Sequence, residues 1–138
     1  MNEPETIADM LGDGRGTDRV IAVVGLSDNP ARPSHSVSAY MQRHGYRILP
    51  VNPQVQQVLG ERSYARLEDL PEPPDVVNVF RLPGEIPGIV ESMIALGLRN
   101  LWVQAGIVNE QAARRAEAAG IRVVMDRCIL VEHGRRFS

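Results

Sequence analysis

The sequence has a single cysteine, Cys128, so the chain can form no internal disulfide. A lone thiol is typical of a reducing compartment, and we therefore expect a cytoplasmic protein. No apolar run approaches the roughly 18 residues that a membrane-spanning helix requires. The acidic start at residues 1–5 also lacks the apolar core of a signal peptide, so we expect no membrane association.

The chain also lacks a block of charge of one sign. Its formal net charge is -2, and no cluster of basic residues interrupts the sequence. Nucleic-acid binding therefore has no electrostatic support. An anionic ligand would have to be held by individual arginines and by backbone N–H groups.

Recognisable catalytic and metal-binding patterns are missing as well. The three histidines, at 35, 44 and 133, are scattered, and no His/Cys cluster has the spacing of a metal site. No Ser-His-Asp set can be argued, and no G-x-x-x-x-G-K-[ST] loop is present. We expect a site that holds a ligand without catalytic or metal residues, and thus a protein that is not an enzyme.

What the sequence does contain is a regular alternation of strand and helix patterns. Short apolar runs predict strands at 20–24, 46–51, 75–80, 100–103 and 121–125. Helical spacing predicts helices at 4–11, from Ser34 or Ser36 to Gly45, at 85–96, and from Asn109 to Gly120. Helical turns are expected at 54–60 and 67–71, and the polar residues 127–138 are expected to wrap the surface.

This alternation is typical of an α/β fold, in which helices cover both faces of a parallel sheet of five or slightly more strands. At 138 residues the chain is expected to form one domain, 17–138, preceded by an N-terminal extension, 1–16, that lies on the surface as an appendage. Ligands of such folds bind beyond the carboxyl ends of the strands. The candidate site therefore comprises 25–36, 51–53, 80–83, 104–107 and 126–128.

The first of these segments has the features of a phosphate site. Gly25 permits a sharp turn after the first strand, and Ser27 offers a hydroxyl and an N–H group to a phosphate oxygen. Arg32, in the long loop that follows, can pair with a phosphate through two parallel hydrogen bonds. The alternatives are a plain strand-to-helix connection for the turn and a solvated surface charge for Arg32.

The remaining segments suggest the walls of the site. Pro53 holds Asn52 extended, where an NAD-binding protein would place a carboxylate for the ribose diol. Phe80, Arg81 and Pro83 end the third strand, where they suit stacking or a phosphate contact, although Phe80 can equally belong to the core. Gln104 ends the fourth strand beside a glycine. Asp126 and Arg127 can simply pair with each other, and Cys128 can be a small buried residue.

Five segments together resemble a known family. They are Val24-Gly-Leu-Ser-Asp-Asn-Pro-Ala-Arg-Pro-Ser34, Tyr46-Arg-Ile-Leu-Pro-Val-Asn-Pro53, Asp75-Val-Val-Asn-Val-Phe-Arg81, Leu101-Trp-Val-Gln-Ala-Gly106 and Val123-Val-Met-Asp-Arg-Cys128. In this order they resemble the stand-alone CoA-binding proteins, which are similar to the N-terminal CoA-binding domain of the succinyl-CoA synthetase α subunit. The resemblance covers about residues 15–133.

The resemblance implies a Rossmann-like, three-layer domain that binds coenzyme A with the pyrophosphate at the first loop. Gly25, Ser27 and Arg32 would then hold phosphates, with Ser36 at the start of the following helix. Asn52 and Pro53 would border the adenosine. Phe80, Arg81 and Pro83 would border the stretch from nucleotide to pantetheine, with Gln104 beyond them. Either Arg32 or Arg81 would meet the 3′-phosphate.

Three functions remain under comparison. The first is a non-catalytic module that binds coenzyme A or an acyl-CoA, with a protein partner or a homo-oligomer left open. The second is the CoA-binding subunit of a split acyl-CoA ligase, because the chain lacks the phosphohistidine domain and the nucleotide-grasping subunit of the synthetases. The third is a fragment of an NAD(P)-linked oxidoreductase, which the missing carboxylate at Asn52 disfavours.

Overall fold

A computed structural model describes residues 1–137 and contains the expected parallel sheet. Its five strands lie in the order β2-β1-β5-β6-β7, and every neighbouring pair is parallel. They span Val20–Val24 (β1), Arg47–Val51 (β2), Val76–Val79 (β5), Asn100–Val103 (β6) and Arg122–Met125 (β7). The α/β class and the five-stranded sheet predicted from the sequence are therefore confirmed.

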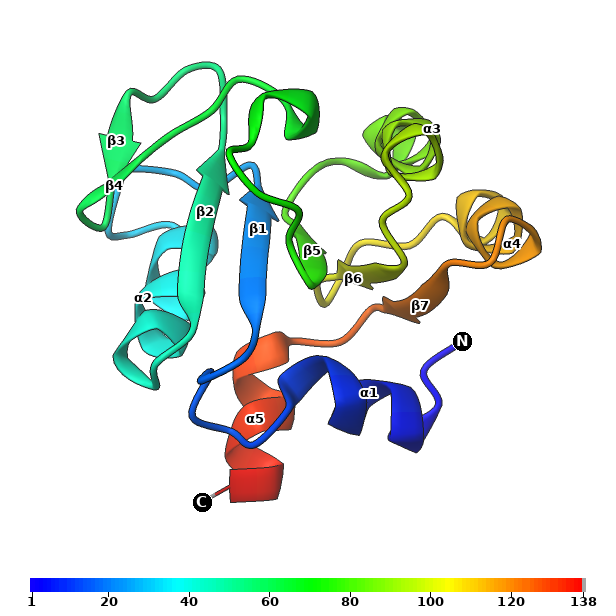
Figure 1. Cartoon of the computed structure of the whole chain (residues 1–138), viewed down its shortest axis with the longest axis horizontal. Coiled ribbons are helices and arrows are strands. Elements are labelled where there is room, and N and C mark those ends of the chain that lie inside the picture. The colour runs from blue at the N-terminus through cyan, green and yellow to red at the C-terminus, as the bar shows by residue number, and fades with distance from the viewer. Residues whose placement is uncertain (138) are drawn as a thin grey trace.

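Helices cover both faces of this sheet, which makes three layers (Figure 1). On one face lie α3 (Ile86–Leu96) and α4 (Glu110–Ala118), and on the other lie α1 (Pro4–Leu11), α2 (Pro33–Arg43) and α5 (Ile129–Phe137). Successive side chains of each strand enter opposite layers. Ala22 and Val24, for example, join the core under α3 and α4, whereas Ile21 and Val23 join the core under α1, α2 and α5.

Several helix ends follow from local sequence. Gly97 ends α3 in the left-handed conformation that favours glycine, and the Asn109 side chain caps α4 by accepting the Ala112 N–H at 3.0 Å. A 3₁₀ turn at Leu67–Asp69 (η1) matches the turn expected near 67–71, and a second one, η2, spans Pro83–Glu85. None of the helices in residues 1–137 is long and apolar enough to cross a membrane.

The sequence interpretation of residues 54–60 is wrong. Instead of a helical turn, the structure has a short antiparallel hairpin of β3 (Gln57–Val58) and β4 (Glu61–Arg62). Leu59 and Gly60 both have positive φ at its tip. Two successive residues in that region favour the tight hairpin turn over a helix.

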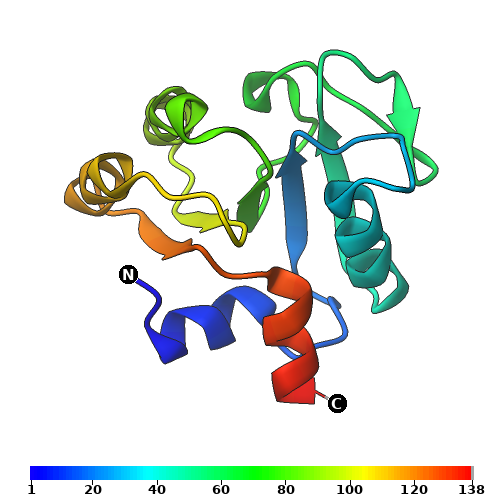
Figure 2. The same cartoon turned by 180° about the vertical axis from the view of Figure 1, so that it is seen from behind.

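The two termini are also packed more tightly than the sequence suggested. Ile7, Met10 and Leu11 of α1 are buried in the core, so this helix is not a surface appendage. Residues 129–137 form α5 rather than an irregular surface wrap, and they bury Ile129 and His133. Seen from behind, α1 and α5 lie together below the amino end of β1 (Figure 2). Both helices are amphipathic. The sequence predicts the helix at 4–11 but not its burial, and the apolar stripe of α5 is too short to stand out in the sequence.

Two of the histidines that look scattered in the sequence meet in space. The ring centroids of His44 and His133 lie 4.6 Å apart, and His133 donates from Nε2 to the Gly14 carbonyl and shares a hydrogen bond with the Tyr40 hydroxyl. This cluster is at the amino edge of the sheet, away from the predicted ligand edge. No group of three or more His, Cys, Asp or Glu residues within 1–137 could hold a metal ion.

Candidate functional site

A cavity of about 710 Å³ lies at the carboxyl ends of the strands, where the loops after β1, β5, β6 and β7 converge. The order of the strands reverses direction here, between β1 and β5, which is where α/β folds bind ligands. The cavity is lined by seven of the ten residues predicted from the sequence, namely Gly25, Ser27, Arg32, Phe80, Arg81, Pro83 and Gln104. Ser36, Asn52 and Pro53 do not line it.

Gly25 has a structural reason to be glycine that needs no ligand. Its φ is +90°, and a Cβ placed there would lie 2.6 Å from the carbonyl oxygen of Phe80. Any side chain would push apart the ends of β1 and β5. The glycine therefore lets the loop after β1 close onto the end of β5, and it lines the cavity.

Ser27 differs from the prediction in one respect. Its backbone N–H, expected to face a phosphate, donates to the Oγ of Ser34 at 3.0 Å, and its own Oγ accepts the N–H of Asn29 at 3.0 Å. The serine hydroxyl hydrogen stays available, but the amide is already engaged. Ser34 is buried and was missed as a site residue, because in the sequence it looked like a helix cap.

The helix α2 begins one residue before Ser34 and three before Ser36, the two starts predicted from the sequence. Pro33 is its first residue, Arg32 occupies the N-cap position, and no side chain caps this end. Arg32, Pro33, Ser34 and Val37 all line the cavity, so the positive end of the helix dipole faces it. Ser36 instead donates its hydroxyl to the Pro33 carbonyl at 3.3 Å.

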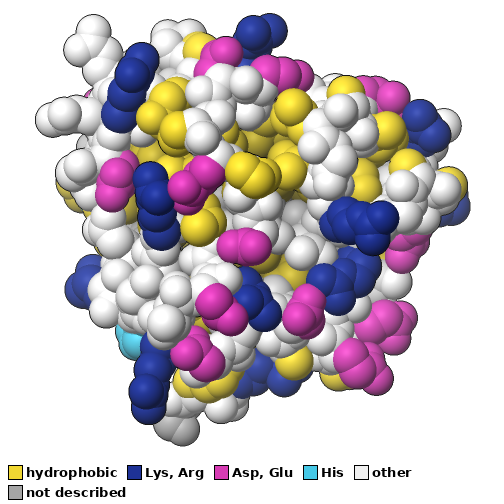
Figure 3. Space-filling view, viewed as in Figure 1, with side chains coloured by type: hydrophobic (Ala, Val, Ile, Leu, Met, Phe, Trp, Pro, Cys, Tyr) yellow, Lys and Arg dark blue, Asp and Glu magenta, His cyan; other side chains and the backbone are white. Residues whose placement is uncertain are grey.

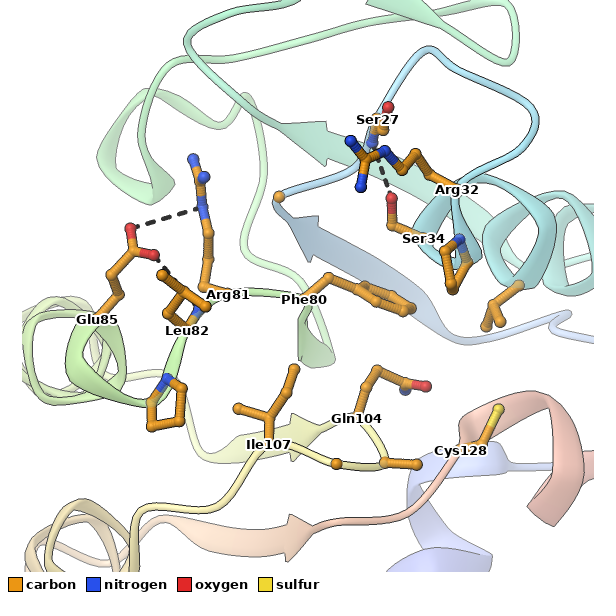
Figure 4. A pocket seen from close by; sticks show the side chains of 16 residues that line it. Ser27, Arg32, Ser34, Phe80, Arg81, Leu82, Glu85, Gln104, Ile107 and Cys128 are labelled. Atoms are coloured by element: carbon orange, nitrogen blue, oxygen red, sulfur yellow. Dashed lines mark hydrogen bonds and ion pairs between the residues drawn. The ribbon is translucent and has the colours of Figure 1, made fainter.

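Two arginines stand on either side of the end of β1 (Figure 4). Arg81 lies 3.9 Å from Glu85, measured from Nε to Oε1, and Glu85 also accepts the N–H of Leu82 at 3.3 Å. Arg32 takes part in none of the ion pairs found in residues 1–137. The chain contains no lysine, so its permanently charged cationic side chains are all planar guanidinium groups, which suit bidentate contact with phosphate.

Seen over the whole face, the charges form no field of one sign. Arginines and acidic side chains are intermixed on the face in view, while apolar side chains gather across its upper part (Figure 3). The cationic character of the cavity is therefore local, supplied by Arg32, Arg81 and the start of α2.

Asn52 and Pro53 lie beside the main cavity rather than in it. Asn52 is buried, donates from Nδ2 to the Leu26 carbonyl at 3.0 Å, and accepts the Gln54 N–H at 2.9 Å. Its amide thus joins the loops after β1 and β2. Pro53 lines a second hollow and also a third of about 560 Å³, which it shares with Arg81. Arg81 therefore connects the main cavity to the side of the molecule where Pro53 lies.

The far end of the main cavity is mostly apolar. Phe80, Ala105, Ile107 and Cys128 line it, together with the buried amide of Gln104. The sequence named Phe80 and Gln104 individually, whereas Ala105 and Ile107 fell only within the candidate segment 104–107, because single apolar residues after a strand carry no distinctive pattern. Cys128 is half-buried and contributes to this wall.

The carboxylate of Asp126 fixes this end of the cavity. Asp126 has a φ of +60°, and its Oδ1 accepts the N–H of Gly106 at 2.7 Å, which joins the loops after β6 and β7. The guanidinium of Arg127 donates to the backbone carbonyl of Asp126 rather than to its carboxylate. The alternative that Asp126 and Arg127 simply pair with each other is therefore wrong.

Comparisons with known proteins place the chain among relatives of one family. The family described as CoA binding domain matches residues 19–134. The uncharacterized protein YneT of Bacillus subtilis (strain 168) is 45% identical over 113 residues, which cover 82% of this chain and 84% of that protein. A Thermus thermophilus structure, titled cell-free ID.343, is 38% identical with a TM-score of 0.86, covering 99% of this chain and 100% of the other.

A more distant relative is an enzyme. The ADP-forming acetate–CoA ligase II of Archaeoglobus fulgidus is 23% identical over 100 residues. The matched segment covers 70% of this chain but only 15% of the ligase. The similarity thus concerns one part of a much longer protein.

Proposed function

The chain belongs to the CoA-binding domain family, and we propose that it binds coenzyme A, free or acylated, as a non-catalytic module. The observation that carries this proposal is the cavity itself. One end is cationic, with Arg32 and the uncapped start of α2, and the other is apolar, with Phe80 and Ile107. Coenzyme A has the same polarity along its length, because phosphates precede a pantetheine arm.

The proposed orientation places the phosphates near Arg32 and Arg81. The pantetheine arm then follows the apolar wall toward Gln104 and Cys128, and the adenosine extends past Arg81 toward Pro53. The volume of about 710 Å³ falls in the usual range for small-molecule sites, about 300–1,000 Å³. The neighbouring hollows provide room for the rest of a long ligand.

The test is a calorimetric titration with CoA, acetyl-CoA, NAD and NADP side by side. We expect CoA to bind at least about ten-fold more tightly than NAD, since β2 is followed by Asn52 and not by a carboxylate for the ribose diol. Tight NAD binding without any heat from CoA would replace this proposal with the oxidoreductase hypothesis.

The similarity to the acetate–CoA ligase supports a second candidate, the CoA-binding subunit of a split acyl-CoA ligase. Under the first proposal, the purified chain has no acyl-CoA synthetase activity with ATP or GTP. Turnover by the chain alone would contradict both candidates, whereas turnover only with a separate phosphohistidine-bearing partner would favour the second. The lone thiol supports a cytoplasmic location for either.

A further inference from the structure

Two amide side chains are buried side by side beneath the cavity. Asn78 of β5 is 1% exposed and Gln104, directly after β6, is 3% exposed. Gln104 donates from Nε2 to the Oδ1 of Asn78 at 2.7 Å. Asn78 lies in register with Val23 on one side and Trp102 on the other, so the pair sits within an otherwise apolar layer.

Buried amides are costly unless their polar atoms are paired. The bond between the two side chains satisfies the amide nitrogen of Gln104 but leaves its carbonyl oxygen. No residue within 1–137 donates a hydrogen bond to that oxygen. Gln104 lines the cavity, and its side chain extends into the space between Phe80 and Cys128 (Figure 4). The structure thus holds an unpartnered acceptor that belongs to a buried side chain and faces the cavity.

The apolar side chains around the carbonyl oxygen of Gln104 limit the kinds of ligand group that can bind there. Phe80, Ala105 and Ile107 supply only apolar surface at this end of the cavity. A fixed acceptor in such a wall favours a ligand group that brings a donor, because a ligand without one leaves the acceptor desolvated and unpaired. Because Nε2 is engaged with Asn78, the oxygen end of the Gln104 amide is the one left facing the cavity.

We propose that the carbonyl oxygen of Gln104 accepts an amide N–H of the pantetheine arm, and that Asn78 is the positioning residue that holds it there. The proposal rests on the proposed function, because it assigns this contact within the coenzyme A site. The pantetheine arm carries two amide N–H groups, whereas its thiol is a weak donor. A pantetheine amide N–H is therefore the donor expected to bind the carbonyl oxygen of Gln104.

The experiment compares three ligands on Gln104→Met, which keeps a side chain of similar length but removes the acceptor. Coenzyme A and acetyl-CoA both carry the pantetheine amides, and adenosine 3′,5′-bisphosphate carries none. We expect affinity for CoA and for acetyl-CoA to fall about ten-fold, and affinity for the bisphosphate to stay within about two-fold. Gln111→Met, an exposed glutamine of α4 outside the cavity, is the matched control and should leave all three unchanged.

Each other outcome contradicts the proposal in a distinct way. An equal loss for all three ligands would make Gln104 a structural residue. A loss for CoA without one for acetyl-CoA would assign the contact to the thiol. No loss for any ligand would remove Gln104 from the site. Failure of the unaltered protein to bind any of the three would instead contradict the proposed function.

Asn78 is tested by two substitutions that remove the same amide. Asn78→Asp keeps an oxygen that can accept from the Gln104 nitrogen, whereas Asn78→Leu does not. We expect Asn78→Leu to weaken CoA several-fold relative to the bisphosphate, and Asn78→Asp to restore the ratio of the two affinities. Equal ratios in both variants would show that Gln104 needs no positioning by Asn78. Where either variant is unstable, the ligand series on Gln104→Met still decides the contact.

Discussion

The two edges of the sheet use their polar groups in opposite ways. At the amino edge, His133 is buried and both of its ring nitrogens are engaged, with the Tyr40 hydroxyl at 2.9 Å and the Gly14 carbonyl at 2.7 Å. At the carboxyl edge, the carbonyl oxygen of Gln104 and the guanidinium of Arg32 have no protein partner within residues 1–137. Among these named groups, only those at the carboxyl edge have hydrogen-bonding capacity left over.

This difference separates a structural cluster from a binding site. At the amino edge, the Gly14 carbonyl can only accept, so the Nε2 of His133 donates to it, and Nδ1 is engaged with the Tyr40 hydroxyl. The cluster is closed and joins α2, α5 and the loop before β1. The open groups at the other edge remain unpaired until a ligand arrives, which is what a preorganised site requires.

We call the amino edge, with its paired histidine cluster, the closed edge, and the carboxyl edge the open edge. The largest expected effect is on folding stability, and it comes from a glycine at the closed edge. Gly45 has a φ of +98°, and its Cβ would overlap the carbonyl oxygen of Arg15. Gly106, at the open edge, has a φ of +84° but no atom within 4 Å of a Cβ. We expect Gly45→Ala to lower the free energy of unfolding by more than about 4 kcal/mol, and Gly106→Ala by about 1–2 kcal/mol from backbone strain alone.

Chemical denaturation of the two alanine variants measures this difference. Because both glycines have similar φ values, backbone strain is matched between them, and only the steric overlap differs. Equal destabilisation would mean that the loop at Arg15 moves aside freely, and the closed edge would then be no tighter than the open one.

At the open edge the largest expected effect is on ligand affinity. We expect Arg32→Ala to weaken CoA by about ten- to a hundred-fold, since a hydrogen bond to a charged group contributes about 1.5–3 kcal/mol, and to weaken 3′-dephospho-CoA less. Arg43→Ala, at the exposed far end of the same helix, is the control. Titration calorimetry on the unaltered protein and the two variants gives six affinities, and equal losses of Arg32→Ala on both ligands would remove Arg32 from the 3′-phosphate.

The closed edge should show its own pH dependence through Tyr46. This side chain is buried and donates its hydroxyl to the carbonyl of Leu11, and burial raises its pKa from 10.0 to about 12. Because the folded pKa is the higher one, the stabilisation is fully present below pH 10 and is lost as the pH rises toward 12. We expect Tyr46→Phe to lower stability by about 1 kcal/mol near pH 8.

The measurement is the unfolding free energy of both proteins from pH 8 to pH 11. The advantage of the unaltered protein should shrink above pH 10, because only its tyrosine ionises on unfolding. A constant difference across this range would show that the hydroxyl of Tyr46 is not held in its neutral form by the fold.

The sheet could be predicted from the sequence because its strands are short apolar runs separated by helices. Residues 21–24 and 123–125 are buried on both faces of the sheet, and such strands carry no competing signal. The hairpin at Gln57–Arg62 and the helix α5 could not be predicted, because their structure depends on partners elsewhere. Tyr64, for example, pairs with Val51 of β2, and His133 is bonded to Gly14, 119 residues away.

The candidate site was predictable to the level of loops but not of atoms. Position after a strand was enough to select Arg32, Arg81 and Gln104, because the carboxyl ends of parallel strands converge. The sequence could not show that the Ser27 N–H is already bonded to Ser34. It also could not show that the side-chain amide of Asn52 is hydrogen-bonded to the backbone of Leu26 and Gln54. Those facts depend on the path of the loops through space.

The smallest expected effect on stability concerns Cys128, whose thiol allows the open edge to be labelled by disulfide exchange. Its sulfur lies in the cavity wall beside the end of the proposed pantetheine arm, and the side chain is half-buried (Figure 4). A Cys128 thiolate can attack CoA disulfide, forming one protein–CoA disulfide and releasing one CoA thiol. We expect intact-mass spectrometry to show a single CoA adduct, absent from Cys128→Ser, with no loss of folding stability in that variant beyond about 1 kcal/mol. Glutathione disulfide, which lacks the nucleotide, should react more slowly, and adenosine 3′,5′-bisphosphate should slow the CoA reaction by occupying the phosphate end.

Equal rates for the two disulfides would mean that binding of the nucleotide does not direct the reaction to Cys128. No adduct under conditions that modify free cysteine would leave Cys128 as a packing residue. Either result would leave the open groups of Gln104 and Arg32 as the features that distinguish the two edges.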